Sequence, residues 1–155
     1  MCIATKTLSG LQAGANELNA WLGHLGLRLL LAYEFGVAGL EKLRGENWFG
    51  VIQDRFPFPL NLVPAEYSWQ MATWSELIGA AALVVGLGTR FASLALIILT
   101  VVAWISVHAG LGYNICDNGY KLSLIYLAMF VPLLLGGAGR LSLDALLARY
   151  LTSRR

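Results

Sequence analysis

The sequence is poor in charged residues and in cysteine. Only 13% of its 155 residues are Asp, Glu, Lys or Arg, whereas globular chains carry about 25%. The formal net charge of +2 is not gathered into a basic stripe, so nucleic acid is not an expected partner. The two cysteines, Cys2 and Cys116, form neither a CxxC motif nor a disulfide framework. Hydrolase, phosphate-loop, haem and zinc motifs are also missing, and an autonomous enzyme is not predicted.

Long apolar runs are what the sequence has in abundance. It is 57% hydrophobic, with a mean hydropathy of +0.65. Four runs cover residues 21–43, 71–88, 91–110 and 122–139, each near the ~20 residues that cross about 30 Å of hydrocarbon. We expect an all-α membrane protein, an antiparallel bundle of four transmembrane helices in one domain over 21–140. The first twenty residues contain several polar side chains and no continuous apolar core, so we expect no cleaved signal peptide.

The first run, GHLGLRLLLAYEFGVAGLEKL, is apolar yet carries Arg28, Glu34, Glu41 and Lys42. A charge at the bilayer centre costs roughly 2.5–3.5 kcal/mol even on insertion scales. The other three runs are therefore expected to pack around this helix and to give its charged groups a polar interior. Arg28 is the expected internal charge partner.

Three further segments flank or interrupt these runs. Residues 1–20 repeat Leu and Ala at three- and four-residue spacing, which predicts an amphipathic lead-in. Residues 44–65 combine aromatic residues with Pro57, Pro59 and Pro64, which predicts extended structure folded as a cap over one mouth of the bundle. Residues 141–155 begin with a helix-capping Ser142 and are expected to form a basic amphipathic tail at the membrane surface.

The distribution of basic residues predicts the orientation. Four crossings place both termini and the turn at residues 89–90 on one side, together with Lys6, Arg90, Arg140, Arg149, Arg154 and Arg155. The other side carries Lys42, Arg44, Arg55 and Lys121. The positive-inside rule counts Lys and Arg and thus favours cytoplasmic termini in a bacterial inner membrane.

Helix rise predicts where the polar groups meet. At ~1.5 Å per residue, groups from three helices reach the outer half of the membrane and could line one outward-facing cavity. The candidates for that cavity are Glu34, Glu41, Lys42, Gln70, Thr73, Glu76, Trp104 and His108. Weaker candidates for a metal site are His108, Cys116 and Asp117.

Glu34 and Glu76 admit two interpretations. Their side chains could approach between neighbouring helices, where two carboxylates in a low-dielectric space cannot both ionise easily. Alternatively they only satisfy Arg28, Thr73 and backbone groups.

Three stretches resemble the DoxX family of small bacterial membrane proteins. They are RLLLAYEFGVAGLEKL in the first run, SELIGAAALVVGLGTRFASLAL across the second and third, and GGAGRLSLD after the fourth. The resemblance covers about residues 23–145 and implies a four-helix antiparallel bundle in the cytoplasmic membrane. The ending GGxGRLSLD resembles most closely the relatives linked to maturation of copper-binding peptides. Other relatives are associated with quinone-linked sulfur oxidation, where additional domains or subunits take part, so we do not expect autonomous thiosulfate:quinone activity.

Three functions follow as hypotheses. The first is an accessory subunit of a membrane redox system whose cavity binds a quinone, a lipid or another small molecule. The second is a non-catalytic membrane partner for a copper-binding modified peptide, with copper as a possible ligand. The third is a small-molecule transporter. All three involve membrane lipids and either a protein partner or a homo-oligomer.

Overall fold

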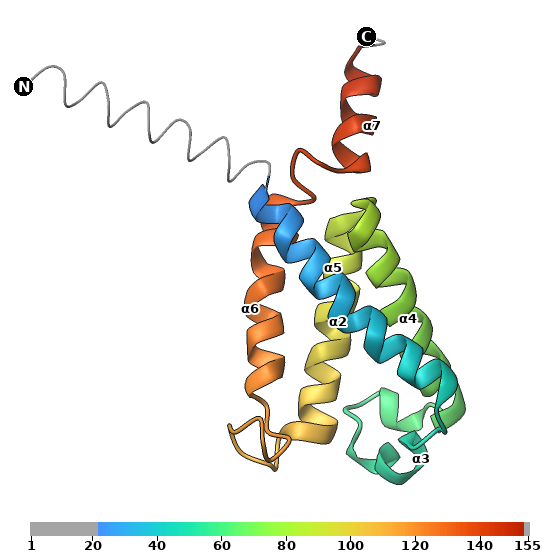
Figure 1. The fold of residues 1–155 in the computed structure, drawn as a ribbon. Coiled ribbons are helices and arrows are strands. Elements are labelled where there is room, and N and C mark those ends of the chain that lie inside the picture. The colour runs from blue at the N-terminus through green and yellow to red at the C-terminus, as the bar shows by residue number, and fades with distance from the viewer. Residues whose placement is uncertain (1–21, 154–155) are drawn as a thin grey trace, which may run out of the picture.

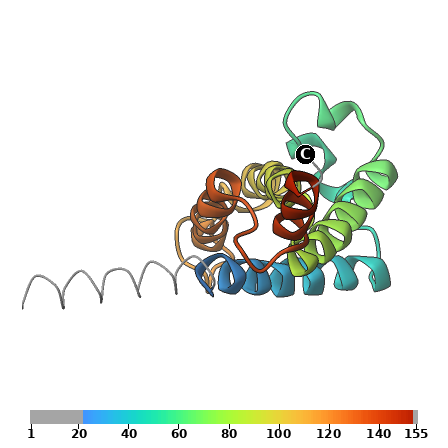
Figure 2. The same cartoon turned by 90° about the horizontal axis from the view of Figure 1, so that it is seen from above.

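The computed structural model describes residues 22–153, and within them every regular element is a helix. The four long helices are α2 (His24–Arg44), α4 (Ala65–Val85), α5 (Thr89–Ala103), which continues as the π-helical turn η4 (Trp104–His108), and α6 (Lys121–Gly136). α2 packs against α4, α4 against α5, α5 against α6, and α6 against α2 (Figures 1 and 2). The predicted all-α fold is confirmed.

The number of membrane crossings is not confirmed. Within residues 22–153, only Thr89–His108 is long and apolar enough to qualify as a span by length and composition. α2 carries five Asp, Glu, Lys or Arg residues, and α4 carries Glu66 and Glu76 among other polar residues. α6 has 16 residues, fewer than the ~20 that a crossing needs.

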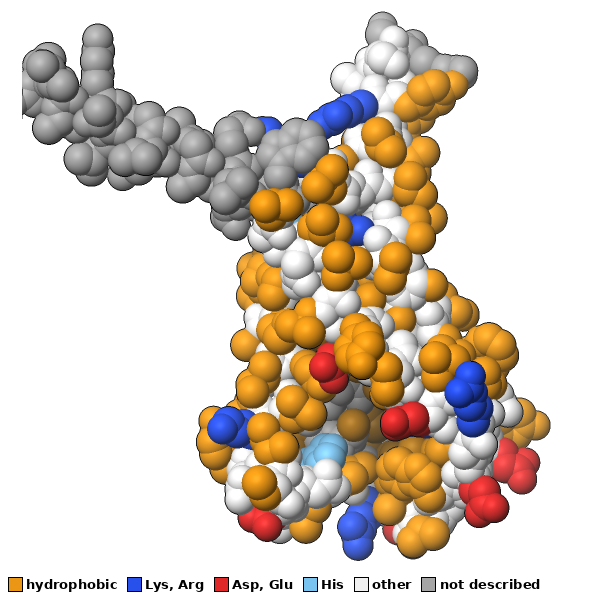
Figure 3. All heavy atoms as spheres, in the orientation of Figure 1, with side chains coloured by type: hydrophobic (Ala, Val, Ile, Leu, Met, Phe, Trp, Pro, Cys, Tyr) orange, Lys and Arg blue, Asp and Glu red, His pale blue; other side chains and the backbone are white. Residues whose placement is uncertain are grey.

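The outward faces of the long helices are nevertheless apolar. The large exposed side chains include Tyr33 on α2, Ile78 on α4, Phe91 on α5 and Leu135 on α6. The space-filling view shows hydrophobic side chains along the whole length of the helical body (Figure 3). A continuous apolar surface of this kind is typical of proteins that contact a membrane or a large partner.

Close helix contacts are made at small residues. A Cβ atom added at Gly79 of α4 would lie 3.0 Å from the Leu96 side chain of α5. One added at Gly39 of α2 would lie 2.9 Å from Leu77 and 3.1 Å from the Cβ of Glu76. These glycines let the helix backbones approach, as small residues do in membrane helix pairs.

The connection between α2 and α4 is helical rather than extended, which corrects the prediction for residues 44–65. It contains three short turns, α3 (Phe49–Ile52), η2 (Gln53–Arg55) and η3 (Leu60–Leu62). The prolines lie between these turns and at the start of α4, where a missing N–H breaks no helical hydrogen bond. Phe49 and Phe56 are buried against Trp69 of α4, with ring centroids of Phe49 and Trp69 5.0 Å apart. This connection, residues 45–64, is called the cap below.

Arg28 organises the opposite end of the molecule. Its guanidinium is buried and donates hydrogen bonds of 2.7–2.9 Å to the carbonyls of Leu83, Val84, Ala138 and Leu141. Two of these carbonyls belong to the last turn of α4, which lacks intrahelical donors. Backbone oxygens thus satisfy Arg28, whereas Glu34 on the same helix bonds elsewhere.

The tail forms a helix, α7 (Leu143–Thr152), that Ser142 caps by accepting from the Ala145 N–H, as predicted. Asp144 accepts from the backbone N–H groups of Gly88 and Thr89 and thereby also caps α5. α7 projects from the body (Figure 1), and its apolar side chains, such as Leu146 and Leu151, are exposed. Its membrane-surface role stays a prediction, and the lead-in at 1–20 lies outside the described residues.

Candidate functional site

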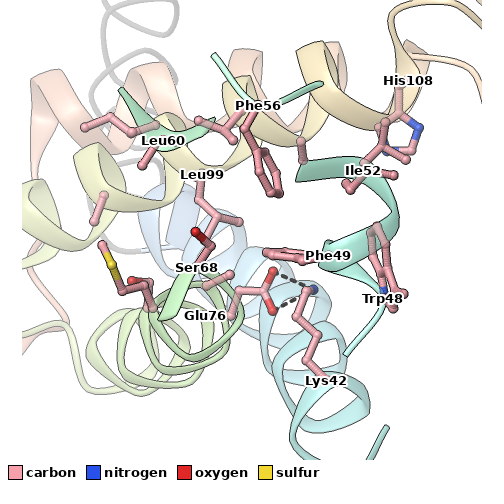
Figure 4. Close-up of a pocket in the computed structure, with 18 of the residues that line it drawn as sticks. Lys42, Trp48, Phe49, Ile52, Phe56, Leu60, Ser68, Glu76, Leu99 and His108 are labelled. Atoms are coloured by element: carbon pink, nitrogen blue, oxygen red, sulfur yellow. Dashed lines mark hydrogen bonds and ion pairs between the residues drawn. The ribbon is translucent and has the colours of Figure 1, made fainter. Parts of the chain in front are cut away.

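A cavity of about 570 Å³ lies between α4, α5 with η4, and the cap. The space-filling view shows a hollow at this end of the molecule (Figure 3), and Figure 4 shows its walls. The cavity is lined by Lys42, Trp48, Phe49, Ile52, Phe56, Leu60, Ser68, Met71, Ala72, Ser75, Glu76, Ala95, Ile98, Leu99, Val102, Ala103, Val107, His108 and Asn118. Most of these side chains are apolar, and the volume is in the range of small-molecule sites.

An ion pair forms the main polar feature of the cavity wall. Lys42 Nζ of α2 donates to both carboxylate oxygens of Glu76 on α4, at 2.8 and 2.9 Å. The side chains are 19% and 4% exposed, respectively. Because an ammonium group has three N–H donors and Glu76 takes two, one N–H of Lys42 can donate to a molecule in the cavity. Figure 4 shows the pair beside the ring of Phe49.

Ser68 supplies a second polar group. Its Oγ is buried and has no hydrogen-bond partner among the described residues. Thr73 and Thr100 instead donate to the carbonyls four residues earlier, as helical hydroxyls commonly do. A buried hydroxyl without a partner in a cavity wall is suited to binding a polar atom of a ligand.

His108 lies on the cavity wall at the end of η4. Its Nδ1 is 2.7 Å from the carbonyl oxygen of Asn118. Since a carbonyl only accepts, we assign the proton to Nδ1, which leaves Nε2 of the neutral ring as an acceptor. The π-helical turn widens the end of α5 here, and such turns occur frequently at functional sites.

A smaller and more polar pocket of about 370 Å³ adjoins the cavity and shares Lys42 with it. Its other lining residues are Leu43, Gly45, Asn47, Glu66, Trp69, Gln70 and Thr73. Lys42 is therefore reachable from two sides, one apolar and one polar.

The predicted site residues are distributed over these two pockets and outside them. Lys42, Glu76 and His108 line the large cavity, and Gln70 and Thr73 line the smaller pocket. The other three predicted residues, Glu34, Glu41 and Trp104, line neither of the two pockets.

Those three have other surroundings. Glu34 accepts from the Tyr126 hydroxyl at 2.6 Å, Trp104 stacks on Tyr120 at 5.3 Å between ring centroids, and Glu41 is exposed. Since Glu34 bonds Tyr126 while Glu76 bonds Lys42, the predicted carboxylate pair is not the arrangement in the structure. Glycines on one face of α2 allow α4 to pack closely there. Glu34 instead points toward α6, where it bonds Tyr126.

The weak metal candidates are not brought together as a ligand set. Cys116 is an exposed free thiol, and Asp117 accepts from the Asn114 side chain at 2.9 Å. Within the described part of the chain, no three His, Cys, Asp or Glu residues are grouped so that they could hold a metal ion.

Sequence reasoning missed most of the apolar wall. It expected the cap to cover a mouth, whereas Phe49, Phe56 and Leu60 of the cap line the cavity itself. A usable signal was the stripe of small residues on α4 at Ser68, Ala72 and Ser75, whose spacing places them on one helical face beside Glu76.

Comparison with known proteins places the chain in a family. The DoxX family model matches residues 23–109, which is more than half of the sequence. The chain belongs to the DoxX family. An uncharacterized protein of Haemophilus influenzae is 56% identical to this DoxX protein over 123 residues, which cover 79% of this chain and 82% of the relative. No solved structure matches it.

Proposed function

We propose that this DoxX protein crosses the membrane with its four long helices and binds an apolar small molecule with a hydrogen-bond-accepting head, such as a quinone, in the large cavity. In this role it serves a membrane redox system as a ligand-binding subunit, with its termini in the cytoplasm and its cavity toward the outer side. The observation that carries the proposal is the Lys42–Glu76 ion pair in the wall of an otherwise apolar cavity.

The surroundings of the ion pair favour a binding role. Burying two charges costs several kcal/mol per ion, and their attraction often only balances that cost. A purely structural contact at this position would be served as well by two apolar side chains. Lys42 shares the cavity wall with the rings of Trp48 and Phe49, so a flat ligand could lie against the rings while its carbonyl oxygen accepts from the third N–H of Lys42.

The test is a titration of the detergent-purified protein with a ubiquinone that carries a single isoprene unit. We expect Lys42→Met to weaken binding by about tenfold, since a hydrogen bond to a charged group contributes roughly 1.5 kcal/mol or more. Glu41→Gln is the matched control, because Glu41 is the exposed neighbour of Lys42 and lines neither pocket.

A second variant separates binding from folding. Lys42→Met leaves Glu76 unpaired, so Lys42→Met combined with Glu76→Leu should recover the thermal midpoint without recovering binding. Unchanged binding in both variants, or no binding by the native chain, would refute the proposed ligand site.

A further inference from the structure

The cavity differs in character along its length. In Figure 4, His108, Ile52 and Trp48 lie toward one end, Leu60 lies at the opposite end, and Glu76 lies between them. Two other lining residues, Met71 of α4 and Ile98 of α5, are 59% and 56% exposed. Because these side chains belong both to the cavity wall and to the outer surface, the cavity reaches that surface between α4 and α5.

The packing of α4 and α5 explains this opening. The helices are joined by a tight turn and touch where Leu96 meets Gly79. Two small residues beside this contact line the cavity: Ser75, which lies farther from the turn than Gly79 on α4, and Ala95, which precedes Leu96 on α5. Farther along α5, Val102 packs against the cluster that Phe49 and Phe56 of the cap form with Trp69 of α4.

We propose that this gap is a lateral portal, through which a ligand with a long prenyl chain enters from the hydrocarbon of the bilayer. The head of the ligand reaches Lys42 and Glu76, and its chain leaves between Ala95 and Ser75 into lipid. The inference rests on the proposed function for the position of α4 and α5 in the membrane. It adds the long prenyl chain of the ligand and its route into the cavity.

The shape and the surroundings of the portal favour a ligand with a long prenyl chain. A cavity of about 570 Å³ holds a drug-sized head and no long chain in addition. The residues around the gap, Met71, Ala95 and Ile98, have apolar side chains, which favour an apolar part of the ligand. A prenyl chain that stays in lipid exposes none of its methylene groups to water during entry.

The first test measures what fills the cavity, without any ligand. A nitroxide label is attached at Ser75→Cys in a Cys2→Ser, Cys116→Ser background reconstituted in bilayers. We expect relaxation of the label by oxygen to exceed relaxation by a water-soluble nickel chelate, as at the lipid-exposed control Ile78→Cys. Relaxation dominated by the nickel chelate, as expected at the cap control Val51→Cys, would show that the cavity opens to water and would overturn the portal.

The second test uses two ubiquinones with the same head, one with a single isoprene unit and one with about eight. Ala95→Trp narrows the portal and is expected to raise the Kd of the long-chain quinone about tenfold while changing the short-chain Kd little. Leu94→Trp is the control, because Leu94 is exposed on the same helix and does not line the cavity.

Equal effects of Ala95→Trp on both quinones, or no effect on either, would overturn the portal as the route. If the label at Ser75 reports hydrocarbon and the native chain binds neither quinone, the portal is supported and the proposed quinone ligand is refuted. The two proposals therefore fail by different results.

Discussion

Arg28 and Glu76 are the charged side chains that residues 22–153 bury most completely, and they are satisfied in different ways. Arg28 donates to four backbone carbonyls and joins the end of α4 to the segment before α7. Glu76 accepts from one side chain, Lys42, and both line the large cavity. Arg28 lines neither pocket, whereas Lys42 lines both, and this difference locates the site.

Substitution of Gly86 tests the structural role of Arg28, because the two residues are in close contact. Its φ is +71°, and an added Cβ would lie 2.5 Å from Arg28 Nη2 and 2.6 Å from Ser142 Cβ. Gly88 has a similar φ of +60° with nothing near its Cβ position. We expect Gly88→Ala to lower the free energy of unfolding by about 1 kcal/mol, the ordinary cost of a left-handed alanine.

Gly86→Ala should cost this amount and about 1–3 kcal/mol more, because Arg28 is displaced. Denaturant unfolding of the two variants in detergent measures the difference. Equal destabilisation would mean that the Arg28 contacts are not tightly packed.

At the scale of elements, the predictable part of the fold is the part governed by local pattern. The apolar runs at 91–110 and 122–139 correspond to α5 with η4 and to α6, because long apolar stretches bounded by turns specify helices directly. The cap could not be predicted in detail, since its short turns depend on burying Phe49 and Phe56 against Trp69, which lies beyond them in the chain.

The site was predictable in the same partial way. Lys42, Glu76 and His108 stood out as candidates for one outward-facing cavity, and all three line the large cavity in the structure. The partners of individual groups could not be deduced, because they are distant in sequence. Arg28 bonds carbonyls 55 to 113 residues away, and Glu34 bonds Tyr126, 92 residues away.

The tail contains two parts that differ in importance for stability. Asp144 caps the N-terminus of α5, whereas the apolar side chains farther along α7, such as Leu146 and Leu151, are exposed. We expect Asp144→Ala to cost about 0.5–2 kcal/mol, as loss of a helix cap does. Deletion from Leu146 onward should leave the thermal midpoint nearly unchanged. A large loss of stability on deletion would show that α7 packs on the body in the membrane-bound protein.

At the scale of the whole molecule, the two ends differ in structure. The end near α7 and the α4–α5 turn is closed by Arg28 and Asp144. The opposite end holds the cap, the connection at residues 109–120 and the cavity (Figure 1). The apolar flanks between the two ends are expected to face lipid.

This arrangement predicts the reactivity of the cysteines in intact cells. Cys116 is exposed at the cavity end, so an impermeant maleimide added outside should label it. Cys2, which lies outside the described residues, should react only with a permeant reagent. Labelling of Cys2 by the impermeant reagent, with Cys116 protected, would reverse the orientation. Cys116→Ser and Cys2→Ser identify which thiol has reacted.

The central claim is that the cavity holds a membrane-derived molecule, and organic extraction of the detergent-purified protein with mass spectrometry tests it most directly. We expect the native chain to retain an apolar molecule in near-stoichiometric amount, and Ser75→Trp, which fills the cavity, to lose it. Leu94→Trp, on the outer face of α5, should retain it. If the native protein carries no such molecule, or if Ser75→Trp folds normally and retains as much as the native chain, the cavity is not the binding site.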